Sequence, residues 1–151
     1  MELNKRICII TGGASGIGAA CARAFSSQGA KVVVTDINMK GAESVADEID
    51  GLAIACDVSI ESDVNAMVKK TEEQLGDVDL FFNNAGVATG GDPLETTLET
   101  WQSQWEINVM AHVYATRAVL PKMLARGEGY LLHTASMAGI LTTHGNLTYA
   151  T

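Results

Sequence analysis

The sequence predicts an α/β fold built on a doubly wound parallel sheet. Short apolar, β-branched runs alternate with stretches of helical spacing along the 151 residues. Strands that alternate with helices in this way form parallel sheets with right-handed crossovers. The first run, residues 7–10, is followed at once by a glycine-rich turn and a helical pattern. Ligands of such sheets bind beyond the carboxyl ends of the strands, so this turn is the first candidate for a binding site.

Size and composition predict one folded domain spanning residues 1–151. Hydrophobic residues make up 47% of the chain, and no low-complexity tract or linker interrupts it. The formal net charge of −8 argues against a nucleic-acid partner held through its phosphates. No apolar run reaches the roughly 18 residues that a membrane span needs, and no signal peptide precedes the first strand. The three cysteines lack metal-site spacing, so we expect a cytoplasmic protein with no metal.

The turn after the first strand has the sequence Thr11-Gly12-Gly13-Ala14-Ser15-Gly16-Ile17-Gly18. A strand, a glycine turn and a helix together present backbone N–H groups and a helix N-terminus to a phosphate. Gly12, Gly16 and Gly18 allow a tight turn, close approach of a pyrophosphate, and close packing of the helix on the strand. Glycines also mark ordinary turns between strands and helices, so the cluster by itself is weak evidence.

An acidic residue stands where the second strand ends. The run at residues 30–35 leads into Asp36, which lies 18 positions after Gly18. A carboxylate there can accept hydrogen bonds from the adenosine ribose hydroxyls of NAD, and its charge would repel the 2′-phosphate of NADP. Neither Ala14 nor Ser15 supplies a cation to offset that repulsion. Asp36 could instead cap the next helix. We favour the ribose role, and therefore NAD over NADP.

Helical patterns fill the spaces between the strands. The first helix is expected to stop near Gly29, and others are expected over residues 42–49 and 60–75. A longer helix is expected from a cap at Thr96 through Leu120, with Pro121 kinking or stopping it. The residues expected on buried helix faces are Ile17, Ala20, Cys21, Ala24, Phe25, Trp101 and Trp105.

Polar residues follow each of the later strands. The run at 52–56 leads into Asp57-Val58, and the run at 78–82 leads into Asn83-Asn84-Ala85-Gly86. The run at 129–136 ends at Ser136, and Tyr149 follows 13 positions later. The carboxyl ends of parallel strands share one edge of the sheet, where the glycine turn also lies. Each motif also has a plain structural interpretation. Asp57 or Ser59 could cap a helix, and residues 83–86 could form an Asn-Gly-type turn. Ser136 could be a strand-end cap and Tyr149 a half-buried aromatic residue.

These motifs, in this order, resemble the short-chain dehydrogenase/reductase family. The glycine spacing T-G-x-x-x-G-x-G, the string Asn83-Asn84-Ala85-Gly86 and the Ser136–Tyr149 spacing carry the resemblance. It covers essentially the whole chain but only the front part of a family member. It implies a Rossmann-type fold with about five strands present and the C-terminal strands missing, which would leave the fifth strand as an exposed edge.

The resemblance also implies roles for residues that the pattern alone leaves open. It places Asp57 and Val58 against the adenine and Asn84 near the nicotinamide-side ribose. Asn108, in the string Trp105-Glu106-Ile107-Asn108-Val109, resembles a catalytic asparagine that holds a water in a proton relay. Without the resemblance, Asn108 is more often a buried, hydrogen-bonded amide.

A serine and a tyrosine that both reach a carbonyl beside a nicotinamide can support hydride transfer coupled to proton transfer. Ser136 would orient the substrate oxygen, and Tyr149 would donate a proton in reduction or remove one in oxidation. NAD carries the hydride chemistry. The expected catalytic residues are Asn108, Ser136 and Tyr149, and the expected cofactor-binding residues are Gly12, Ser15, Gly16, Ile17, Gly18, Asp36, Asp57, Val58 and Asn84.

The function expected from the resemblance is that of an NAD(H)-dependent oxidoreductase acting on a small-molecule alcohol or carbonyl, homo-oligomeric at full length. The alternative is a non-catalytic dinucleotide-binding or regulatory module. An epimerase or dehydratase is disfavoured by the three residues between Gly12 and Gly16. Two histidines carry less weight: His133 is expected to face the core or a helix, and His144 is a lesser candidate for substrate contact.

The family pattern also supplies a cation next to the tyrosine. A free tyrosine has a pKa of about 10, and a neighbouring positive charge favours its phenolate form. In the family a lysine lies four residues after the tyrosine, which would be position 153, whereas the sequence ends at Thr151. We therefore expect this sequence to be part of a longer protein, with little or no turnover by these 151 residues alone.

Overall fold

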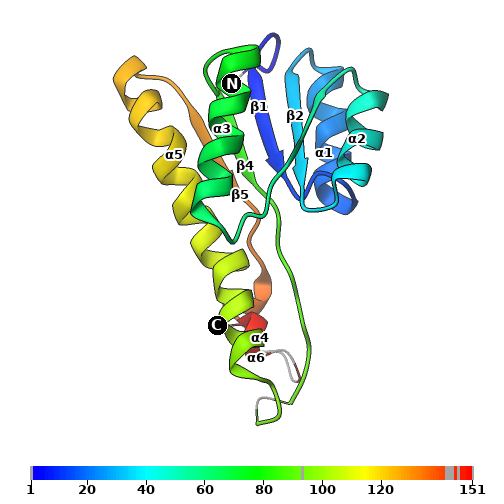
Figure 1. Cartoon of the computed structure of the whole chain (residues 1–151), viewed down its shortest axis with the longest axis vertical. Coiled ribbons are helices and arrows are strands. Elements are labelled where there is room, and N and C mark those ends of the chain that lie inside the picture. Colours follow the sequence, from blue (N-terminus) through cyan, green and yellow to red (C-terminus); the bar gives the residue numbers. More distant parts are fainter. Residues whose placement is uncertain (1, 93, 142–144, 146, 151) are drawn as a thin grey trace.

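Five parallel strands form one twisted sheet in the order β3-β2-β1-β4-β5 (Figure 1). The computed structural model describes residues 2–92, 94–141, 145 and 147–150. The strands are β1 (Ile7–Thr11), β2 (Lys31–Asp36), β3 (Leu52–Ala55), β4 (Leu80–Asn83) and β5 (Tyr130–His133). The strand order reverses between β2-β1 and β1-β4, which creates the switch point where doubly wound sheets bind ligands. The predicted α/β class and doubly wound sheet are confirmed.

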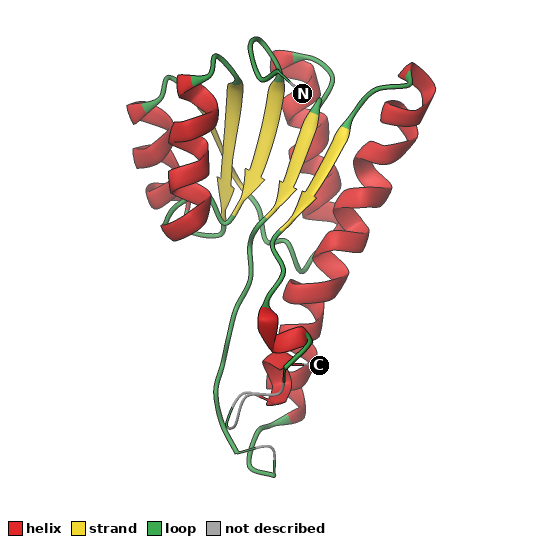
Figure 2. Ribbon diagram, turned by 180° about the vertical axis from the view of Figure 1, so that it is seen from behind, coloured by secondary structure: helices red, strands yellow, loops and turns green. Residues whose placement is uncertain are grey.

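Helices cover both faces of the sheet (Figure 2). α1 (Gly16–Ser27) and α2 (Met39–Glu48) pack on one face. α3 (Glu61–Leu75) and α5 (Ala111–Arg126) pack on the other. The remaining helical elements are α4 (Leu98–Trp105), a π-helical turn η1 (Glu106–Met110), a 3-10 turn η2 (Met137–Gly139) and α6 (Leu147–Ala150).

The core consists of two apolar layers that share the central strands. Cys8 and Ile10 of β1 face α1 and α2, whereas Ile9 faces α3 and α5. All three side chains are fully buried. A strand that is buried on both faces is apolar throughout, which explains why apolar and polar residues do not alternate along β1.

Helix α1 buries a different set of residues from the one predicted. Gly18, Ala19 and Ala22 are its fully buried residues, whereas Ile17 is 62% exposed. A Cβ at Gly18 would lie 2.2 Å from the Gly12 carbonyl oxygen. The helix therefore approaches the glycine turn along its smallest side chains, which turns Ile17 outward. Of the predicted set, Cys21 and Phe25 are partly buried and pack against the core, while Ala20 and Ala24 are exposed.

The predicted long helix exists but differs from the prediction at both ends and in its middle. α4, η1 and α5 follow one another without a break, and the lower part extends well beyond the sheet (Figures 1 and 2). Its N-cap is Thr97, which accepts from the N–H of Thr100, and not Thr96. Pro121 does not stop it, because this exposed residue removes one backbone hydrogen bond on the solvent side. The helix ends at Gly127, whose φ of +72° is left-handed.

At the amino ends of the central strands, a carboxylate joins three elements. Asp79 Oδ2 accepts from the Ile7 backbone N–H at 2.9 Å, and Oδ1 accepts from the Arg6 guanidinium at 3.1 Å. The same oxygen lies 3.7 Å from the Arg126 guanidinium. Arg6 also pairs with Glu128, so the start of β1, the start of β4 and the end of α5 are held together here.

We expect Asp79→Ala to lower the free energy of unfolding by about 2 kcal/mol, because it leaves the part-buried Ile7 N–H without its acceptor. Urea unfolding measures the change. Glu73→Ala is the matched control: Glu73 pairs with Lys69 on the exposed face of α3, and we expect a loss of about 0.5 kcal/mol or less. Equal losses for the two variants would contradict the role given to Asp79.

Candidate active site

Two adjoining cavities lie at the carboxyl ends of the strands. The larger, of about 590 Å³, is lined by the glycine turn, the ends of β2, β3 and β4, and Tyr149, and we call it the glycine-loop cavity. The smaller, of about 370 Å³, lies beside Ser136 and Tyr149, and we call it the serine–tyrosine cavity. They share five lining residues: Asn84, Ala85, Gly86, Thr134 and Tyr149.

The glycine turn has the shape that a phosphate-binding loop requires. Gly12 and Gly16 adopt φ values of +64° and +51°, which side-chain-bearing residues rarely tolerate. A Cβ at Gly12 would come within 2.9 Å of the Ala85 Cα, so glycine is also needed for the close approach to β4. Ser15 is the N-cap of α1 and makes no side-chain capping bond, and no acidic residue lies in that helix's first turn. The N-terminus of α1 therefore opens on the cavity, and a helix N-terminus of this kind suits an anion.

Asp36 lies at the end of β2 and holds the glycine turn in place. Its carboxylate accepts from the backbone N–H of Ala14 at 3.1 Å and from that of Asn38 at 2.9 Å. The N-cap of α2 is Asn38, which accepts from Gly41, so the interpretation of Asp36 as that cap is wrong. The two contacts leave carboxylate lone pairs free on a residue that lines the glycine-loop cavity.

Asp57 and Val58 lie across the same cavity, after β3. Asp57 Oδ1 accepts from the backbone N–H of Ser59 at 3.0 Å and from its hydroxyl at 2.6 Å. The N-cap position of α3 is Ile60, so neither Asp57 nor Ser59 caps that helix as the simpler interpretation proposed. Cys56 also lines the cavity, but burial raises the pKa of its thiol to about 12, which removes it as a nucleophile.

Asn84 is fixed by contacts to two neighbouring strands. Its Nδ2 donates to the Thr11 carbonyl at 3.0 Å, and its Oδ1 accepts from the Thr134 hydroxyl at 3.0 Å. The buried Thr11 hydroxyl accepts from the backbone N–H groups of Asn84 and Ala85. Thr11 thus supports the cavity wall, and sequence reasoning missed this position. A threonine that ends a buried strand directly before a glycine turn was the available signal.

Asn108 lies in the π-helical turn, and its side chain binds the segment after β4. Its Oδ1 accepts from the Val87 N–H at 2.9 Å, and its Nδ2 donates to the Val87 carbonyl at 2.8 Å. Both atoms of the amide are thus used to hold a segment that lines the glycine-loop cavity. π turns inside α-helices occur frequently at functional sites.

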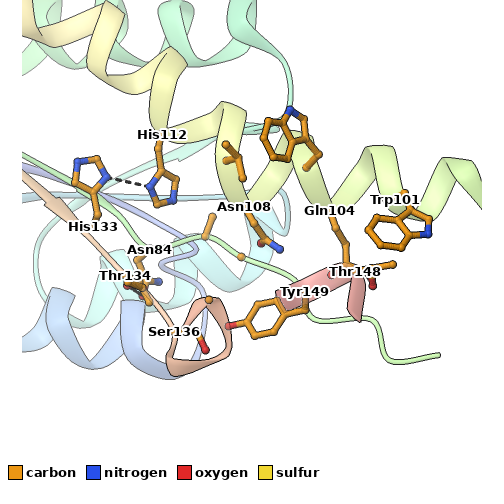
Figure 3. Close-up of a pocket in the computed structure, with 16 residues that line it drawn as sticks. Asn84, Trp101, Gln104, Asn108, His112, His133, Thr134, Ser136, Thr148 and Tyr149 are labelled. Carbon is orange, nitrogen blue, oxygen red and sulfur yellow. Dashed lines mark hydrogen bonds between the residues drawn. The ribbon is translucent and has the colours of Figure 1, made fainter. Parts of the chain in front are cut away.

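Asn108, Ser136 and Tyr149 line the same serine–tyrosine cavity. The Tyr149 hydroxyl points toward Ser136 (Figure 3). Ser136 lies three residues after the end of β5, so it does not end the strand as predicted. Instead it begins η2, where its Oγ accepts from the Ala138 N–H at 3.1 Å. The exposed Ser136 hydroxyl keeps its proton available to a second partner.

Several residues that sequence reasoning assigned elsewhere also line this cavity. Trp105 is 48% exposed and Trp101 is half-buried, so neither is the core anchor predicted. His133 faces helix α5, as predicted, where its Nδ1 lies 3.0 Å from Nδ1 of His112 (Figure 3). His112 was missed, because a lone histidine in a helical pattern carries no local signal. His144 lies outside the described residues.

The two imidazoles stack, with their ring planes at 23° to each other. Their ring centroids are 5.0 Å apart, whereas the facing nitrogens are 3.0 Å apart. At this distance one ring donates to the other, and the tautomers decide which ring is the donor. Burial, and then the nearby His133, lower the pKa of His112. Among the described residues, no group of three or more His, Cys, Asp or Glu side chains gathers where a metal ion could be held.

Comparison with known proteins identifies the family. The short chain dehydrogenase family matches residues 6–151. The chain belongs to the short-chain dehydrogenase family. A 1-deoxy-11-beta-hydroxypentalenate dehydrogenase of Streptomyces exfoliatus is 37% identical to it over 99% of this chain and 58% of that protein. A D-threitol dehydrogenase of Mycolicibacterium smegmatis is 33% identical over 98% of this chain and 59% of that protein.

A solved structure of the same family agrees closely with the fold. A short-chain dehydrogenase/reductase from Burkholderia phymatum, in complex with NAD, superposes with a TM-score of 0.96 at 31% identity. The superposition covers 99% of this chain and 56% of that one. This short-chain dehydrogenase chain thus spans a little over half the length of these relatives. None of its described helices is both long and apolar enough to cross a membrane.

We expect acidification to destabilise the fold through His112. The folded state disfavours the charged imidazolium, whereas the unfolded chain takes up the proton near pH 6.5. The unfolded state then binds more protons, so this contribution is complete above about pH 6.5 and is lost as the pH falls through the lower folded pKa. Urea unfolding between pH 7.5 and 5.5 measures it. His112→Gln should flatten the slope, and an unchanged slope would contradict this assignment.

Proposed function

We propose that the protein is an NAD(H)-dependent oxidoreductase that transfers hydride between the nicotinamide and an alcohol or carbonyl substrate. The observation that best supports this proposal is that the two cavities share one wall. Tyr149 lines both, and the Ser136 hydroxyl lies in the serine–tyrosine cavity toward which the Tyr149 hydroxyl points. A carbonyl group there would adjoin a dinucleotide in the glycine-loop cavity.

The residues around the glycine-loop cavity fit such a dinucleotide. The open N-terminus of α1, with Gly12, Ser15, Gly16 and Ile17 before and within it, suits the pyrophosphate. Gly18 lies beneath and lets the helix pack closely on the turn. Asp57 and Val58 would flank the adenine, and Asn84 would lie by the nicotinamide-side ribose. When bound, NAD supplies the hydride acceptor and NADH the hydride donor.

The chain's own residues would orient the substrate and move the proton. Ser136 donates its hydroxyl hydrogen to the substrate oxygen while its own oxygen stays bonded to the Ala138 N–H. Tyr149 gives a proton to that oxygen in reduction and takes it in oxidation. The side-chain amide of Asn108 is bonded to the backbone of Val87. The backbone of Asn108, inside the π turn, would therefore be the part that holds a water of a proton relay.

A non-catalytic dinucleotide-binding module is the second candidate. The two candidates agree on dinucleotide binding and differ only in turnover.

The test is Tyr149→Phe in the natural-length protein, with substrates screened among alcohols because dehydrogenases of D-threitol and of 1-deoxy-11-beta-hydroxypentalenate are relatives. We expect kcat to fall by about 100-fold or more, since the proton donor is lost, with NADH binding unchanged. NADH-linked absorbance measures the rate. No turnover by the wild-type protein with intact NADH binding would favour the non-catalytic module, and an active Tyr149→Phe variant would exclude Tyr149 as the acid–base group.

The cofactor prediction rests on the Asp36 carboxylate, which lines a cavity with no Lys or Arg among its described residues. We expect NADH to bind more tightly than NADPH, because the 2′-phosphate would meet the Asp36 charge. Asp36→Asn should reduce the ratio of the NADPH Kd to the NADH Kd by about 10-fold. Fluorescence titration with both cofactors measures the affinities. Asp47→Asn, on the exposed face of α2, is the control and should leave the preference intact. Equal affinities in the wild-type protein would remove the role of Asp36.

We further propose a cytoplasmic, homo-oligomeric enzyme at full length. The three cysteines are free thiols, which suits a reducing compartment. Exposed apolar side chains on the long helix, Trp105, Val113 and Leu124, offer area for a subunit contact. Light scattering on the natural-length protein tests the assembly, and a monomer would contradict it.

A further inference from the structure

Tyr149 lies in α6 (Leu147–Ala150), which packs against α4. The residue before it, Thr148, is only 9% exposed. The contacts that hold Thr148 therefore bear on the position of the Tyr149 hydroxyl.

One buried amide of α4 supplies a specific contact. Gln104 is 2% exposed, and its Nε2 donates to the Thr148 hydroxyl at 2.5 Å and to the Thr89 carbonyl at 3.3 Å. The Thr148 hydroxyl in turn donates to the same carbonyl at 3.2 Å. The three groups form a closed triangle between α4, α6 and the segment after β4.

The nitrogen of this amide, and not its oxygen, makes the contacts with Thr89 and Thr148. In the described structure Gln104 Oε1 is buried and has no hydrogen-bond partner, so the side chain is held through its nitrogen alone. A flipped amide would place an oxygen against the Thr89 carbonyl and lose that bond. A donor is required at this position, and glutamine supplies it while it keeps the site neutral.

The triangle lies next to the contact made by Asn108. Gln104 precedes Asn108 by four residues, and both side chains line the serine–tyrosine cavity. Asn108 holds Val87, and Gln104 holds Thr89, so the same stretch of helix fixes the segment after β4 at two points. Val87 and Ala88 of that segment line the glycine-loop cavity.

We infer that Gln104 and Thr148 are positioning residues that link the segment bordering the glycine-loop cavity to the Tyr149 hydroxyl. The inference rests on the proposed function, in which Tyr149 is the acid–base group. A ligand that orders residues 87–89 also orders the carbonyl of Thr89, and through it Thr148 and the helical turn of Tyr149. The link therefore sets Tyr149 in place when the cofactor binds.

The test uses the natural-length protein. Tyrosine labelled with ¹³C at the ζ carbon gives one NMR signal per residue, and the signal lost in Tyr149→Phe is that of Tyr149. In the wild-type protein we expect the Tyr149 signal to move when NADH is added. In Thr148→Val, which keeps the shape of the side chain but not its hydroxyl, we expect that movement to fall to about a third or less. Gln104→Met, which keeps volume but not the donor, should have the same effect.

Two variants separate positioning from general loss of structure. Thr148→Ser restores the hydroxyl and should restore the NADH-induced movement. Gln102→Met removes an exposed amide of the same helix, bonded to Glu106, and should leave the Tyr149 signal as in the wild type. A wild-type response in Thr148→Val, or a Thr148→Ser variant that behaves like Thr148→Val, would overturn the inference.

The outcome does not depend on turnover. The signal of Tyr149 without NADH also reports its surroundings, and we expect it to shift toward that of free tyrosine in Thr148→Val and in Gln104→Met. If the wild-type, natural-length protein fails to bind NADH, the proposed function fails. The unliganded signals still decide the link between Thr148 and Tyr149, because an unshifted signal in both variants would refute it.

Discussion

The buried hydroxyl of Thr11 joins the two strands on which both cavities depend. It donates to the Phe82 carbonyl and accepts from the backbone N–H groups of Asn84 and Ala85. These bonds tie the end of β1 to the end of β4 at the point where the strand order reverses. The turn at Gly12 then lies so close to Ala85 that no side chain fits between them. The glycine turn, the Asn84 amide and the segment that Asn108 holds all take their places from this junction.

The strands and most helices could be predicted because their signals are local. The apolar run before Gly12 and the β-branched run before Asp36 each identify a buried strand without knowledge of its neighbours. Alternation with helices then implies parallel pairing. The residues at strand ends, such as Asp36, Asp57 and Asn84, could be expected to gather at one edge because topology alone brings them there.

What could not be predicted depends on contacts between distant residues. Ile17 has helical spacing, but the close approach of Gly18 to Gly12 turns it outward. Trp105 looks like a core residue, but it is 48% exposed at the end of α4, and α4 lies beyond the sheet (Figure 1). The pairs His112–His133 and Gln104–Thr148 join residues 21 and 44 positions apart. The sequence around each of these residues does not indicate which distant residue it contacts.

The π turn at residues 106–110 restricts changes in the length of this helix. A π turn holds one residue more than the α-helical turn it replaces, and one residue corresponds to about 100° of rotation in an α-helix. Deletion of a single codon in this stretch would restore an unbroken α-helix and rotate α4 relative to α5. The amides of Gln104 and Asn108 could then no longer reach Thr89 and Val87 together. This part of the reading frame should therefore tolerate substitutions far better than changes in length.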